Sequence, residues 1–175
     1  VIHPPQLMSD WNQICSYING IEYGREFLFA LDEMRKSNNH RFKIGIENMI
    51  APKKRSISLG YNPSQLKNLL GSTETIGLTV DSGHRLLSDE MSVSKMFSIA
   101  PIVSLHFHSN PGVFLKDGYK DDSHDFALQT NLENFNAYLR SIRRYNLPVT
   151  CEIGIENIPK ETLISYINTL RFMLD

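Results

Sequence analysis

Histidines and carboxylates recur at or just beyond the ends of short apolar runs in this sequence. In chain order they are His3, Glu47, Asp81, His84, His106, His108, Asp122, His124 and Glu152. Imidazole nitrogens and carboxylate oxygens are ligands for zinc, manganese and similar divalent cations. Carboxylates brought together without a cation would repel and raise one another's pKa values, and a bound metal removes that conflict. One such residue alone would indicate a structural role, but the repetition predicts a divalent-metal site.

The spacing of these residues narrows the choice of ligands. Asp122 and His124 are two positions apart, which places both side chains on the same side of an extended loop. His106 and His108 also share parity along one apolar run, so only one of them needs to be a ligand. The other is free to pack in the interior or to contact a substrate.

The apolar runs predict five strands, over Val1–His3, Phe42–Glu47, Ile76–Asp81, Ile102–Phe107 and Val149–Ile153. Segments with helical periodicity follow them, and the clearest are Glu22–Ser37, Pro63–Leu70, Asn131–Tyr145 and Pro159–Leu174. This alternation is typical of βαβ units, so we expect an α/β fold with a mainly parallel sheet. The carboxyl ends of parallel strands meet at one rim, which brings the polar residues together.

Composition excludes several classes of protein. No run of about 18 apolar residues is present, which excludes a membrane-spanning helix. The net charge of −1 gives no electrostatic reason to expect nucleic acid, and a run of three basic residues, 53–55, is typical of a solvated loop. Two cysteines, Cys15 and Cys151, do not make a disulfide framework, so a reducing cytoplasmic location is expected.

Six stretches match a known pattern in order and spacing: Val1–Pro4, Ile46–Asn48, Val80–His84, Leu105–Asn110, Asp122–His124 and Pro148–Glu152. Through them the chain resembles the xylose isomerase-like TIM barrels. This superfamily contains the endonuclease IV-type enzymes of AP endonuclease family 2 and many sugar or sugar-phosphate isomerases and epimerases. The resemblance implies that residues 1–175 form a single domain, the C-terminal five βα units (strands four to eight) of a (β/α)8 barrel.

The length of the chain bears on that interpretation. A complete barrel typically takes about 250 residues, against 175 here. We therefore expect that the N-terminal strands of the barrel are missing from this chain. A half-barrel completed by another chain is the alternative, and the oligomeric state stays open.

The resemblance also implies roles for individual residues. The central metal site shared by both branches of the superfamily corresponds to Glu47, Asp81, His106 and Glu152. In the endonuclease branch, a further zinc is held at the positions of His84, Asp122 and His124, and His3 with Glu47 forms part of another zinc site. Glu156 competes with Glu152 for the last position because both have the same strand parity; Glu152 is preferred because it lies nearer the start of its strand.

These roles lead to three hypotheses of function. The leading one is a sugar or sugar-phosphate isomerase or epimerase that depends on zinc or manganese and transfers a proton through a metal-stabilised enediolate. Glu47 or Glu152 would act as the base, with the other carboxylate or His84 assisting. The alternative is a zinc-dependent AP endonuclease that hydrolyses DNA phosphodiesters, and the third is a non-catalytic barrel that binds a small molecule.

Two positions depart from the endonuclease pattern. Ser109 stands where that branch has an aspartate, and Ser123 stands where it has an arginine. Both departures argue against recognition of a DNA end. The glycine-rich continuation usual after the loop motif is also replaced, by Asp125–Gln129, and Ser109 together with this altered loop motivates the hypothesis of a non-catalytic barrel.

Overall fold

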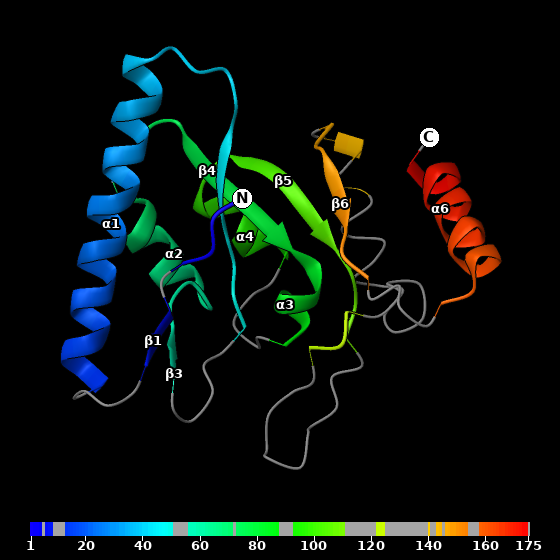
Figure 1. Ribbon diagram of the computed structural model, residues 1–175, viewed down its shortest axis with the longest axis horizontal. Coiled ribbons are helices and arrows are strands. Elements are labelled where there is room, and N and C mark those ends of the chain that lie inside the picture. The colour runs from blue at the N-terminus through cyan, green and yellow to red at the C-terminus, as the bar shows by residue number, and fades with distance from the viewer. Residues whose placement is uncertain are drawn as a thin grey trace.

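The computed structural model describes most of the chain, and Figure 1 shows its helices and strands. The described residues are 1–4, 6–8, 13–50, 56–71, 73–87, 93–110, 122–124, 140, 143–144, 146–153 and 158–174. Among them the strands are β1 (Gln6–Met8), β2 (Ile44–Glu47), β3 (Ser56–Ser58), β4 (Ile76–Asp81), β5 (Ile102–Phe107) and β6 (Val149–Cys151). The helices are α1 (Gln13–Ser37), α2 (Pro63–Leu70), α3 (Ser82–Leu86), α4 (Val93–Ile99) and α6 (Lys160–Leu174).

The main sheet is parallel and its strands follow chain order, β2–β4–β5–β6. Ile2 extends it with a parallel bridge to Ile46, in which the Ile2 amide donates to the Gly45 carbonyl at 2.9 Å. In Figure 1, α1 lies on the β2 side of this sheet and α6 lies beyond β6. The predicted α/β class is confirmed, and the four parallel strands in sequential order are those of a partial barrel.

Buried apolar side chains hold the sheet against its helices. Every residue of β2 and β4 is buried, and Leu78 and Val80 are completely inaccessible. Leu66 and Leu69 of α2 join the same core. Burial on both faces explains why these strands read as continuous apolar runs in the sequence.

Local sequence signals fix the ends of α2. The Asn62 side chain accepts a hydrogen bond from the Gln65 amide at 2.9 Å, and Pro63 stands in the first turn, where a missing N–H has no consequence. Gly71 follows the last turn with a φ of 47°, a conformation that side chains disfavour. The predicted helix has these same bounds.

Most of the other predicted elements also exist, but the strand predicted over Val1–His3 is reduced to the single bridge at Ile2. The strands Ile76–Asp81 and Ile102–Phe107 are confirmed without change, and the strand predicted from Phe42 begins at Ile44. The strand predicted over Val149–Ile153 ends at Cys151, and the helix predicted from Glu22 begins at Gln13 because one long helix follows β1. Most of the helix predicted over 131–145 lies outside the described residues.

The sequence reading missed three features of the described chain. These are the antiparallel pair β1–β3 and the short helices α3 and α4. The pair and α3 are three to five residues long, too short for a periodic pattern to show. Among the described helices, none combines the length and the apolar character needed to cross a lipid bilayer.

Candidate metal centre

Four side chains from neighbouring strand ends converge at the carboxyl edge of the sheet. We call them the inner group: Glu47, Asp81, His106 and Glu152. One ligand-capable atom from each lies within 4.8 Å of the others. The parallel register produces this convergence, since Asp81 of β4 pairs directly with His106 of β5.

His106 Nδ1 lies at the middle of the inner group. It is 2.9 Å from Glu152 Oε1, 3.1 Å from Glu47 Oε2 and 3.9 Å from Asp81 Oδ2. Despite this proximity, Glu47 Oε2 and His106 Nδ1 are both buried and neither makes a hydrogen bond. Buried polar atoms are normally hydrogen-bonded, so this arrangement needs an explanation. Imidazole nitrogen and carboxylate oxygen atoms gathered this closely are suited to a divalent cation, so the residues present fit the predicted metal.

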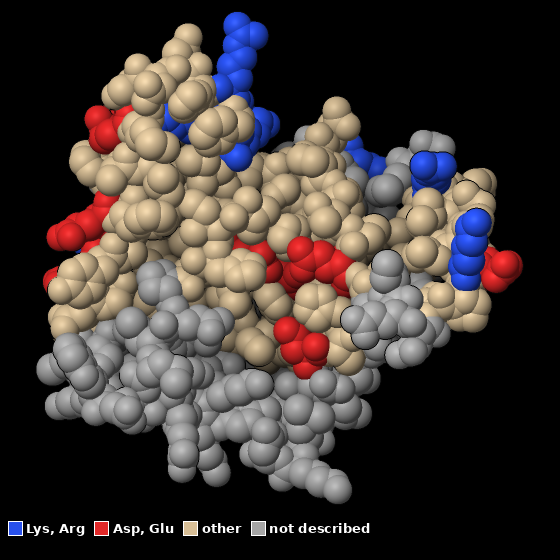
Figure 2. Space-filling model, viewed as in Figure 1, with Lys and Arg blue, Asp and Glu red and all other residues tan. Residues whose placement is uncertain are grey.

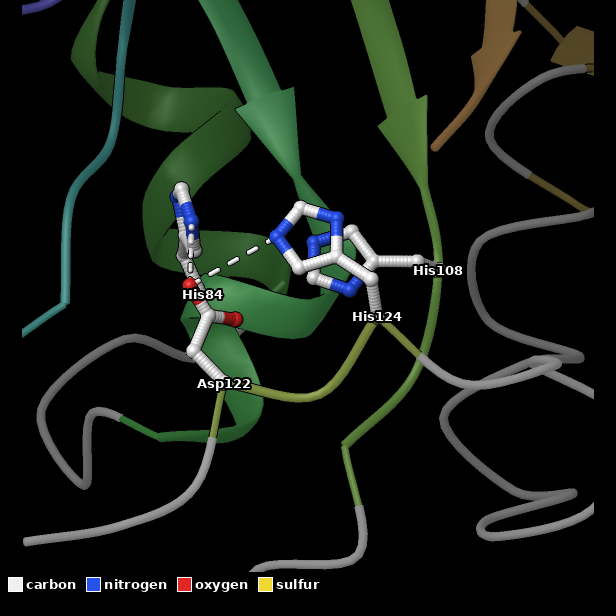
Figure 3. A group of neighbouring side chains, drawn as sticks. All are labelled: His84, His108, Asp122 and His124. Carbon is white, nitrogen blue, oxygen red and sulfur yellow. Dashed lines mark ion pairs between the residues drawn. The ribbon is translucent and has the colours of Figure 1, made fainter. Parts of the chain in front are cut away.

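Three histidines and an aspartate form a second cluster, shown in Figure 3. We call it the outer group: His84, His108, Asp122 and His124. Asp122 Oδ2 lies 3.4 Å from His84 Nε2 and 3.6 Å from His124 Nε2. The ligand-capable atoms again lie within 4.8 Å of one another.

Backbone carbonyls orient two of the outer histidines. His84 Nδ1 is 2.9 Å from the Asn48 carbonyl, and His124 Nδ1 is 3.2 Å from the Glu152 carbonyl. A nitrogen that donates to a carbonyl must carry the proton, so in a neutral ring Nε2 presents its lone pair toward Asp122. Metal-binding histidines are typically held in this way.

The charges of the two groups are strongly coupled. Burial raises the pKa of Glu47, but the adjacent imidazoles of His106 and His84 outweigh it and bring that pKa down to about 2. Burial lowers the pKa of His84, yet Asp122 and Glu47 together raise it to about 11. The pKa of His106 is raised mainly by Glu47, against the effect of burial. Without a metal, protons on the histidines therefore balance the carboxylates, and a bound cation would displace those protons.

The predicted site residues therefore fall together. Seven of the eight predicted metal ligands lie in the inner or outer group, and the eighth, His3, places Nε2 3.3 Å from Glu47 Oε2 with its side chain 63% exposed. The sequence favours Glu152 over Glu156 as the last ligand, and the Glu152 carboxylate lies in the inner group; Glu156 lies outside the described residues. The Ser109 side chain that departs from the endonuclease pattern is buried.

Two asparagines that the sequence reading did not single out support the groups. Asn48 exchanges two hydrogen bonds with the backbone of Asp81, at 2.7 and 3.1 Å. Asn110 donates to Asp122 Oδ1 at 3.1 Å and accepts from the backbone amide of Ser123 at 2.8 Å. Asn48 directly follows Glu47 at the end of β2, and this position next to a predicted ligand could have identified Asn48 from the sequence.

Comparison with known proteins supports the fold. No protein-family model and no curated protein matches the chain. A solved structure of a D-tagatose 3-epimerase-like protein superimposes with a TM-score of 0.74 and 24% identity, covering 99% of this chain and 60% of that one. The chain has part of a TIM-barrel fold.

A second solved structure agrees with the first. The apo form of 3-keto-D-glucoside 4-epimerase from E. coli matches with a TM-score of 0.60 and 10% identity, covering 90% of this chain and 54% of that one. The chain therefore spans 54% to 60% of the length of these two structures. The resemblance drawn from the sequence is confirmed at the level of the fold.

Proposed function

We propose that this chain forms part of a sugar or sugar-phosphate isomerase or epimerase that depends on a divalent metal. The inner group would hold the metal, zinc or manganese. The observation that carries the proposal is the meeting of Glu47 Oε2 and His106 Nδ1, which are buried 3.1 Å apart without a hydrogen bond. The names of the two structural neighbours, a D-tagatose 3-epimerase-like protein and a 3-keto-D-glucoside 4-epimerase, support the substrate class.

Glu47 and Glu152 have different roles in the proposed reaction. When bound, the cation would stabilise negative charge that develops on the oxygens of the sugar. The Glu152 side chain is 31% exposed, whereas that of Glu47 is 1% exposed. Glu152 can therefore approach a substrate and accept a proton from carbon, while Glu47 stays ionised as a buried ligand because its pKa is held at about 2.

His84 has a supporting place in this arrangement. Its Nδ1 lies 3.2 Å from Glu47 Oε1, and its Nε2 faces Asp122 in the outer group. Its side chain is 7% exposed, so this member of the outer group contacts Glu47 of the inner group in the interior of the protein. We propose that it fixes the Glu47 carboxylate and assists proton transfer through that contact.

Exchange of sugar protons with heavy water tests the proposal. The manganese-loaded protein is incubated with a panel of ketoses and ketose phosphates in deuterated water, and deuterium on carbon is followed by NMR. We expect exchange with at least one sugar and a loss of about 10²- to 10⁴-fold in Glu152→Gln, the range for a general base. Glu161→Gln is the matched control, because Glu161 is exposed on α6. A protein that holds manganese but exchanges no sugar proton would contradict the proposal.

The outer group favours a second candidate, the zinc-dependent AP endonuclease. His84, Asp122 and His124 converge as the endonuclease branch requires for its further zinc. Binding to DNA phosphates depends on Lys and Arg. On the face of the molecule that Figure 2 shows, acidic side chains lie near the middle, and Lys and Arg side chains lie near the margins. We therefore favour the sugar. Cleavage of an abasic duplex that a chelator abolishes, with three zinc ions per chain, would reverse that preference.

A further inference from the structure

His108 is a member of the outer group that also contacts the inner group, and neither the predicted ligands nor the proposed reaction accounts for it. Its Nε2 is 3.0 Å from each carboxylate oxygen of Asp81, a member of the inner group. Its ring stacks on His124 of the outer group, with ring centroids 3.9 Å apart and planes inclined by 6° (Figure 3). One buried ring therefore contacts both groups.

The turn between β4 and α3 is built around this ring. A Cβ atom on Gly83 would lie 2.0 Å from His108 Cε1, so only glycine leaves room for the ring in this position. Ser82 accepts a hydrogen bond from the His108 amide at 3.0 Å and donates its own hydroxyl to the His108 carbonyl at 2.5 Å. The His108 side chain is completely buried as a result.

The contact with Asp81 determines which nitrogen of the His108 ring is the hydrogen-bond donor. A carboxylate accepts hydrogen bonds, so Nε2 carries the proton in this contact and cannot donate a lone pair to a metal. His108 Nδ1 is buried and makes no hydrogen bond. The ring thus acts on Asp81 through its N–H and on His124 through its face.

We infer that His108 is a positioning residue that couples the two groups. Its N–H fixes the Asp81 carboxylate for the cation of the inner group, and its ring supports His124 in the outer group. Filling one group therefore changes the metal affinity of the other. This inference rests on the metal binding of the proposed function and not on its substrate.

Two substitutions separate the contacts of His108. His108→Phe keeps a ring to stack on His124 but removes the N–H, whereas His108→Gln keeps a donor and removes the ring. Gly83→Ala displaces the ring without changing its chemistry. His40→Gln is the matched control, because His40 is exposed and outside both groups.

Cobalt(II) titration of the chelator-treated full chain measures the effects, with visible absorption reporting the coordination. An Asp122→Asn background removes a ligand of the outer group, so that the inner group is titrated by itself. There we expect His108→Phe and Gly83→Ala to weaken cobalt binding by about 10- to 100-fold, the usual effect of losing a partner that orients a metal ligand. His108→Gln should retain most of the affinity of the inner group and weaken the outer group. Introduced alone, Asp122→Asn should also change the cobalt affinity of the inner group. The same substitution should have no such effect in a protein that already carries His108→Phe.

The outcomes distinguish this inference from the proposed function. If the wild-type protein binds no cobalt, the proposed function fails. If it binds cobalt and all three variants match it in affinity and spectrum, the coupling role of His108 is wrong while the proposed function stands. Loss of one whole cobalt equivalent in both His108 variants, with the other site unchanged, would make His108 a ligand and also overturn the inference. Should a His108 variant not fold, as thermal unfolding would show, Gly83→Ala carries the same test.

Discussion

Asp32 and Glu47 are equally buried carboxylates with opposite surroundings. Asp32, on α1, is 0% exposed and accepts hydrogen bonds from the amides of Glu74 at 2.9 Å and Thr75 at 3.0 Å, and from the Thr75 hydroxyl. Lys36 Nζ lies 3.0 Å from it. Glu47, at the end of β2, is 1% exposed, and its Oε2 makes no hydrogen bond.

The difference separates a carboxylate that holds the fold from one that can hold a ligand. Burial acts against ionisation in both, yet both pKa values lie below the ordinary range. For Asp32 the compensation comes from backbone amides, a hydroxyl and a lysine, which saturate its oxygens. For Glu47 it comes from His106 and His84, whose nitrogens can release a proton to a metal. Donor chemistry, rather than burial or charge, distinguishes the two sites.

The largest expected effect is on metal affinity. Glu47→Gln removes a charged ligand of the inner group, so we expect manganese or zinc to bind more than about 100-fold more weakly, beyond the range typical for residues that only orient ligands. Asp32→Asn should leave that affinity unchanged, because Asp32 is in neither metal-capable group. Isothermal titration calorimetry on both variants makes the measurement. Equal losses of metal affinity in the two variants would contradict the distinction between a structural carboxylate at Asp32 and a metal ligand at Glu47.

The same contrast explains what the sequence could predict. Glu47, Asp81 and His106 were identifiable because a parallel sheet brings strand ends together whatever the loops do. Asp32 was not, because its partners, Glu74 and Thr75, lie more than 40 positions away in a loop without a motif.

The sequence leaves the role of His108 open for a related reason. Strand parity shows that His106 and His108 lie on one side of β5, but not that Gly83 makes room for the second ring. Close approach of that kind depends on the turn into α3, a helix too short to show a periodic pattern.

The next effect is on stability, and it should appear at Asp32. In Asp32→Asn, a side-chain amide takes the place of a carboxylate that accepts several buried hydrogen bonds, so some buried N–H donors lose their acceptor. We therefore expect a loss of about 3 kcal/mol in the free energy of unfolding. Urea unfolding of the chelator-treated protein measures it. Glu33→Gln is the matched control on the same helix: its side chain is 50% exposed and also contacts Lys36, so a change within about 0.5 kcal/mol is expected. A similar loss in both variants would mean that charge near Lys36, not saturation of a buried carboxylate, stabilises this region.

The smallest effect is the pH dependence of the two regions, which should run in opposite directions in the metal-free protein. The pKa of Asp32 is lowered from its usual 3.8, so its contribution is present above about pH 4 and is lost as the pH falls toward its lower folded pKa. The pKa of His84 is raised to about 11, so its contribution is complete below pH 6.5 and is lost as the pH rises toward 11. Unfolding free energies across this pH range should therefore show the Asp32→Asn difference shrinking in acid and the His84→Gln difference shrinking in base. Two differences that shrink at the same end of the scale would show that the carboxylates, and not their donors, govern both regions.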